Sequence, residues 1–154
     1  MKKLFVLTLL FVSLCNTSKA QESYKIKLTN TFVEWNFGVA YIFEEFVAPG
    51  TSVLWGKSFV DENNLILEYE LGFALPSLIT GKFGIGKKIN STVVTFGIRP
   101  FPFNFYLQSS YNKSKKGYWI ASLEFNPLDS ESIVSFESKA ILNFGYRWNL
   151  KNKQ

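Results

Sequence analysis

The chain has 154 residues, of which 47% are hydrophobic and 18% aromatic, and its formal net charge is +5 at pH 7. This length suits a single domain. With one Cys and no His in the whole sequence, a disulfide framework, imidazole catalysis and the usual His/Cys metal sites are excluded.

The first twenty residues have the pattern of a cleaved export signal. A positive start precedes an apolar core (4–14) that is too short to span a membrane as a helix, and Ser18-Lys19-Ala20 supplies the small residues that a signal peptidase reads. We therefore expect residues 1–20 to be a signal peptide and residues 21–154 to form a barrel domain. Cleavage would remove Cys15 and three basic residues, leaving 14 basic and 12 acidic residues. So small an excess gives no reason to expect a nucleic-acid partner.

Two kinds of connection alternate along the rest of the chain. Connections with proline recur at intervals of 25 to 27 residues, at Pro49, Pro76, Pro102 and Pro127. Polar connections without proline lie between them, at 61–64, 87–90 and 112–117. Because proline cannot donate a hydrogen bond to a sheet, its confinement to connections predicts a chain made almost entirely of strands.

The connections delimit eight runs of strand length, and most of them alternate large apolar residues with polar or small ones. In chain order the runs are 31–44, 51–60, 64–75, 79–86, 94–99, 103–108, 118–125 and 142–149. The orientation of the second run is open, because Lys57 shares a face with Trp55 and Phe59. The predicted fold is all-β: an eight-stranded antiparallel up-and-down transmembrane barrel, since closure removes both sheet edges.

The apolar face of these strands is expected to point outward, toward lipid. The opposite face is small and carries a few charges of both signs, which suits a narrow lumen better than a water-facing exterior. A strand that crosses a bilayer needs about 9–11 residues, a length that the run 64–75 reaches. The inward charged residues are expected to form an interior ion-pair network: Glu34, Glu68, Glu70, Lys82, Arg99, Glu124 and Arg147.

A soluble barrel also fits the alternating pattern. An exported lipocalin-like barrel would turn the apolar face inward and carry a small apolar ligand. The two barrels differ in the positions of Leu71 and Glu70: the membrane barrel requires Leu71 outside and Glu70 inside. A three-residue turn at Leu75-Pro76-Ser77 would then set Glu70 opposite Lys82.

The tryptophans give the predicted membrane barrel a direction. If both termini and the polar turns face the periplasm, three tryptophans near the corresponding strand ends are expected to form a periplasmic aromatic girdle: Trp35, Trp119 and Trp148. Trp35 is assigned to the start of the first strand on this interpretation.

No residue pattern predicts an enzyme. Glu68 and Glu70 share a strand face and could suggest acid–base catalysis, but a lumen filled by side chains leaves no room for a substrate. The segment 81–88 approaches a phosphate-binding loop, yet Lys88 stands where Ser or Thr would be needed and no helix follows. We expect no catalytic residues, no cofactor and no metal.

The export signal, eight alternating strands, short turns and the closing segment AILNFGYRWNL together resemble the small eight-stranded outer-membrane barrels of Gram-negative bacteria, the OmpA/OmpX type. The resemblance covers residues 31–150 and is one of pattern. It implies a monomer in the cell outer membrane, in contact with lipid and, during biogenesis, with the outer-membrane assembly machinery. It also implies a non-enzymatic structural or surface-interaction role without a through-pore.

Overall fold

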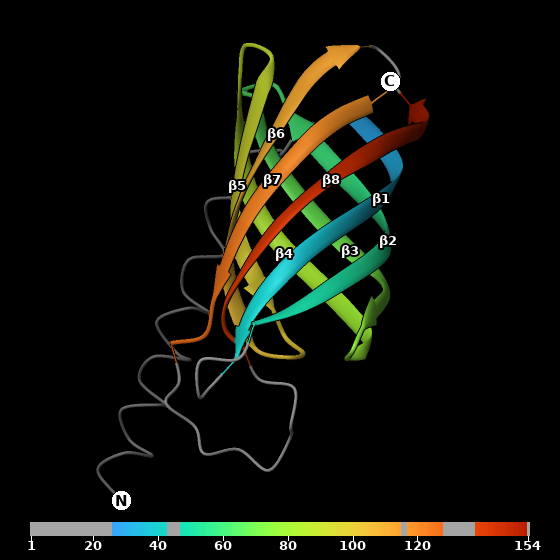
Figure 1. Ribbon diagram of the computed structural model, residues 1–154. Helices are drawn as coiled ribbons and strands as arrows, with labels where there is room; N and C mark the ends of the chain where they lie inside the picture. Colours follow the sequence, from blue (N-terminus) through green and yellow to red (C-terminus); the bar gives the residue numbers. More distant parts are fainter. Residues whose placement is uncertain (1–25, 43–46, 115–116, 128–137, 154) are drawn as a thin grey trace, which may run out of the picture.

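A computed structural model describes residues 26–42, 47–114, 117–127 and 138–153, and in this part of the chain the fold is a closed antiparallel barrel (Figure 1). Its eight strands are β1 (Ile26–Ile42), β2 (Val47–Asp61), β3 (Leu65–Leu75), β4 (Leu78–Ile89), β5 (Thr92–Arg99), β6 (Asn104–Ser114), β7 (Gly117–Phe125) and β8 (Ser138–Lys153). Each strand pairs with the next, and β8 returns to pair with β1, so the predicted eight-stranded antiparallel up-and-down barrel is confirmed. The signal-peptide prediction lies outside the described residues.

Within the described ranges, no helix has both the length and the apolar character needed to cross a membrane.

The strands that close the barrel are longer than the alternation predicts. β1 begins at Ile26 rather than at residue 31, and β8 extends to Lys153 rather than ending at residue 149. Their ladder includes the pair Thr29 and Lys153, which lies beyond both predicted boundaries. Strands in a barrel are tilted and staggered, so the first and last strands must extend past their neighbours to remain paired. At the start of β1 the apolar residues Leu28 and Phe32 occupy inward positions, opposite to the phase of the rest of the strand, and the end of β8 is mostly polar, so the alternation did not predict either extension.

The two ends of the barrel differ in their connections. We call the end that carries the start of β1, the end of β8 and the turns around Asn63 and Asn90 the terminal end, and the opposite end, with Pro76 and Pro102, the proline end (Figure 1). The turn after β2 is held by the side chain of Asp61, whose Oδ1 accepts hydrogen bonds of 2.8 Å from the backbone N–H groups of Asn63 and Leu65.

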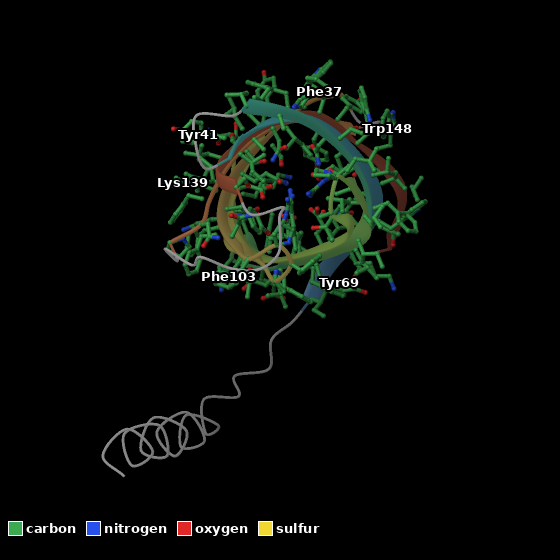
Figure 2. All side chains as sticks on the ribbon, turned by 60° about the horizontal axis from the view of Figure 1, so that its bottom comes forward. Phe37, Tyr41, Tyr69, Phe103, Lys139 and Trp148 are labelled. Atoms are coloured by element: carbon green, nitrogen blue, oxygen red, sulfur yellow. The ribbon has the colours of Figure 1, made fainter. Side chains whose placement is uncertain are left out.

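Large apolar side chains cover the outside of the barrel, and polar side chains fill its inside. In Figure 2 the labelled Phe37, Tyr69 and Trp148 project outward, while side chains tipped with nitrogen and oxygen gather within the ring. The orientation of β2, which the sequence left open, is now defined: Trp55 and Lys57 point outward, and Leu54 is fully buried.

Tyr106 is the largest fully buried side chain, and two glycines make space for it. A Cβ built on Gly84 would collide with the Tyr106 hydroxyl, and one built on Gly97 would lie 2.7 Å from both Tyr106 Cε1 and the Gly84 Cα. Real Cβ atoms do not approach so closely, so these positions of β4 and β5 accept only glycine without rearrangement.

Gly97→Ala is therefore expected to destabilise the barrel by about 1–3 kcal/mol, because the added methyl group overfills the interior. Gly81→Ala is the matched control: Gly81 lies on the outer face of β4, where the nearest atom to an added Cβ is 3.1 Å away. Its effect should stay within about 0.5 kcal/mol. Urea unfolding of each variant, followed by tryptophan fluorescence, measures both. Equal midpoints for the two variants would contradict this account of the interior.

Candidate functional site

The seven charged residues predicted for the interior all lie inside the barrel, and each is at most 6% exposed. They come from six strands, and ion pairs join all seven into one connected network. Its members are Glu34, Glu68, Glu70, Lys82, Arg99, Glu124 and Arg147. The placement follows from strand alternation, because every member occupies an inward position of its strand.

Arg147 on β8 is the centre of the half of the network nearer the terminal end. Its Nη2 lies 2.7 Å from Glu34 Oε2 and 2.5 Å from Glu70 Oε1, and its Nη1 lies 3.0 Å from Glu68 Oε2. The guanidinium also stacks over the ring of Phe32, 3.7 Å from its centroid. A planar guanidinium with five N–H donors can bind several carboxylates at once, which a lysine could not do with the same geometry.

Glu124 on β7 links the two remaining cations. Its Oε1 lies 2.9 Å from Arg99 Nη2 and 3.5 Å from Lys82 Nζ. Lys82 Nζ also lies 3.9 Å from Glu34 Oε1, and this longer contact connects the two halves of the network. The long distances show that Lys82 acts as a shared charge between two carboxylates rather than as a closely bonded partner of either.

The predicted register of β3 and β4 is present, because Glu70 stands opposite Lys82 in the ladder. The ion pairs do not follow this neighbour relation. Glu70 pairs with Arg147 on β8, while Lys82 pairs with carboxylates on β1 and β7. In a narrow barrel a long side chain reaches across the lumen more readily than it folds back toward its ladder partner, so register alone could not assign the ion pairs.

The network also has neutral members, which the sequence pattern did not single out. Asn36 Nδ2 donates to Glu34 Oε1 at 2.7 Å, Asn143 Nδ2 donates to Glu124 Oε1 at 2.9 Å, and Lys82 Nζ donates to Gln108 Oε1 at 3.5 Å. All three amides occupy inward positions of their strands, which is the signal that could have identified them.

The network separates two cavities at opposite ends of the lumen. The cavity at the terminal end, about 470 Å³ in volume, is bounded by Arg147 and Glu68. A much smaller cavity at the proline end, about 60 Å³, is bounded by Arg99 and Asn143.

All four carboxylates of the network are paired with its cations. Glu68 and Glu70 each direct one carboxylate oxygen at Arg147, and both side chains are almost fully buried. Among the described residues, no three or more Asp, Glu, His or Cys side chains come together in a way that could hold a metal ion. The arrangement can fix the shape of the interior.

The three tryptophans that were predicted to form one girdle lie on the adjacent strands β7, β8 and β1, and both Trp35 and Trp119 have Tyr146 as their ladder partner. Trp119 and Trp148 lie near the terminal end, and Tyr146 between them contacts both rings edge to face, with centroid distances of 5.2 and 5.0 Å. The placement of Trp35 near the start of the first strand is wrong. Because β1 begins at Ile26, Trp35 lies near the middle of that strand, where its Nε1 donates to Thr51 Oγ1 at 3.0 Å.

No protein-family model matches the chain, and no curated protein matches it significantly. Among solved structures, it is similar to one from "De novo design of transmembrane beta-barrels", with a TM-score of 0.49 and 14% identity, over 79% of this chain and 95% of that one. It is also similar to the "Solution NMR structure of de novo designed TMB2.3", with a TM-score of 0.46 and 11% identity, over 79% and 96% of the two chains. Likenesses this distant imply no shared function.

Proposed function

We propose that the protein is an integral outer-membrane β-barrel of structural or surface-interaction type, monomeric and non-enzymatic, without a through-pore. The observation that carries this proposal is an apolar outer surface that continues around all eight strands. One residue from the middle of each strand illustrates it, each between 50% and 65% exposed: Phe37, Trp55, Leu71, Phe83, Phe96, Leu107, Leu123 and Phe144.

An apolar surface of this extent is unfavourable in water. Monomeric soluble proteins rarely expose contiguous apolar patches of more than a few hundred Å². Here the usual distribution is reversed, since charged residues such as Lys82 and Glu124 are buried and Leu71 and Phe73 are 65% exposed. A bilayer stabilises this arrangement, because lipid covers the apolar exterior and the closed ladder leaves no backbone edge unpaired. The soluble ligand carrier requires the opposite orientation.

The two barrel ends support a direction across the membrane. Leu75, Leu78 and Phe101 lie at the proline-end turns and are at least half exposed, whereas the terminal-end turns carry polar residues such as Glu62 and Asn63. Outer-membrane barrels have short turns on the periplasmic side, and the terminal-end turns after β2 and β4 are short as well as polar. With the Trp119–Tyr146–Trp148 cluster near it, the terminal end is the one that we assign to the periplasm.

The same features support the rest of the proposal. The buried network lies between the two cavities of the lumen, which supports a barrel without a through-pore, and its carboxylates are engaged by cations, which supports a non-enzymatic role. Export through the signal at residues 1–20 and insertion by the outer-membrane assembly machinery are the biogenesis route that such a barrel would need. Any surface partner would meet the connections at the proline end.

Membrane fractionation tests this proposal. We expect the mature chain to be recovered with outer membranes, to resist extraction by high salt or alkali, and to dissolve only in detergent. An unheated sample should migrate differently from a boiled one on a gel, as closed barrels do when they resist unfolding in detergent. Reconstituted protein should show no steady conductance across a planar bilayer. Recovery in the soluble periplasmic fraction would refute the membrane barrel.

A further inference from the structure

The terminal-end cavity differs in chemistry from the rest of the lumen. Its 470 Å³ lies within the range of pockets that hold small molecules. Its floor is the polar network, with Arg147 and Glu68, and its mouth opens beside Lys27 and Lys88. The cavity therefore joins the buried charges to the solvent at one end of the barrel.

Part of the wall of this cavity is an apolar cluster, which we call the collar. Val60, Ile66 and Val93 pack together, each at most 8% exposed, and Leu28 packs against them. The other inward positions in the described part of the barrel are mostly polar, so this cluster differs from the rest of the interior. A collar that lines a cavity leaves apolar surface facing unoccupied space, and an alkyl chain would remove that surface from water.

The accessible charge at the mouth is positive. Lys27 and Lys88 are exposed, and no ion pair connects either of them to another residue in the described ranges. The carboxylate that lines the cavity, Glu68, is 2% exposed and is held by Arg147. An anionic group at the mouth would thus meet two uncompensated cations, with the collar directly below it.

We propose that the terminal-end cavity binds a single-chain amphiphile with an anionic head, such as a medium-chain carboxylate. The alkyl chain occupies the collar of Leu28, Val60, Ile66 and Val93, and the head group lies at Lys27 and Lys88. The site is inside the lumen, so it does not depend on what covers the outer surface. It goes beyond the proposed membrane role because it assigns a ligand class to the barrel.

Methyl NMR of the full mature chain in zwitterionic-lipid nanodiscs tests the proposal, with sodium decanoate as the probe. Val60 and Val93 point into the cavity, whereas Val53 and Val94 point outward on the same strands, β2 and β5. Saturable shifts of the Val60 and Val93 methyl groups, without matching shifts of Val53 and Val94, are expected. Shifts of all four with one concentration dependence would show partition into the bilayer and would overturn the proposal, as would no saturable shift.

Neighbouring lysines on β4 give matched variants. Lys88 lines the cavity and Lys87 points outward, and both are exposed. Lys88→Glu is expected to weaken decanoate binding about tenfold, and Lys87→Glu to change it less than about twofold. Equal effects of the two variants would overturn the role of the mouth in binding the anionic head.

Uncharged decanol should bind more weakly than decanoate, and equal binding would count against the anionic head. Tighter binding of a decanoyl lysophospholipid would identify a lipid source, and tighter binding of decanoate a free carboxylate.

Discussion

Replacing Arg147 with methionine is expected to destabilise the barrel by about 3–5 kcal/mol, the cost of removing one partner from a buried set of charges. The guanidinium is the cation bonded to Glu68 and Glu70, and it shares Glu34 with Lys82. Without it, three almost fully buried carboxylates would be left close together in the lumen. Methionine keeps much of the side-chain volume, so the loss would reflect charge rather than a cavity.

A triple variant separates charge balance from packing. Arg147→Met combined with Glu68→Gln and Glu70→Gln leaves two carboxylates, Glu34 and Glu124, with the two cations Lys82 and Arg99. The triple variant is therefore expected to recover most of the stability that the single variant loses. Urea titration of the folded, heat-sensitive gel band measures both. A triple variant no more stable than the single one would show that the packing of Arg147, and not its charge, matters.

Leu71→Arg is expected to cost about 2–4 kcal/mol and to impair assembly in the membrane, because it places a charge against lipid near the bilayer midplane. Leu71 is 65% exposed and lies in the middle part of β3, beside Trp55 of β2. In water the same substitution would replace an exposed apolar residue with an exposed charge and would be close to neutral. A lipid environment therefore predicts a loss of stability for Leu71→Arg, whereas a water environment predicts almost no change.

Ile89→Arg is the control for depth. Ile89 is also exposed and outward, but it is the last residue of β4, at the terminal end. There the cost should fall to about 0–1 kcal/mol. Folding yield into vesicles and the urea midpoint of the folded fraction compare the two variants. If both arginines are tolerated equally well, the outer surface does not face lipid.

The alternation of residue types was enough to predict the strands and their orientations for most of the barrel. It works because one face of each strand meets a polar, crowded lumen and the other does not, so residues such as Leu71 and Glu70 have opposite requirements. It was inconclusive for β2, where Lys57 lies on the apolar outer face. A lysine at that position can extend its charged end toward the terminal end while its stem lies along the apolar surface.

The sequence could not predict which side chains contact one another across the lumen. Neighbouring strands follow from chain order, and the turn length predicted the pairing of Glu70 with Lys82 in the ladder. The ion pairs between β8 and β3 depend on the diameter of the barrel and on side-chain conformations, which no local pattern encodes. The same holds for the apolar collar, because Ile66 interrupts the alternation of β3 and Val60 and Val93 belong to other strands.

The strands of this barrel differ widely in length, and the long ones are neighbours. β8, β1 and β2 are adjacent and have 16, 17 and 15 residues, whereas β5, on the opposite side of the ring, has 8. In the proposed membrane setting, the bilayer would have to thin beside β5 and could keep its full thickness beside β1. Such hydrophobic mismatch costs fractions of a kcal/mol per Å and is relieved when thinned regions merge. A barrel without sheet edges would thereby still have one side on which the surrounding bilayer is thinner.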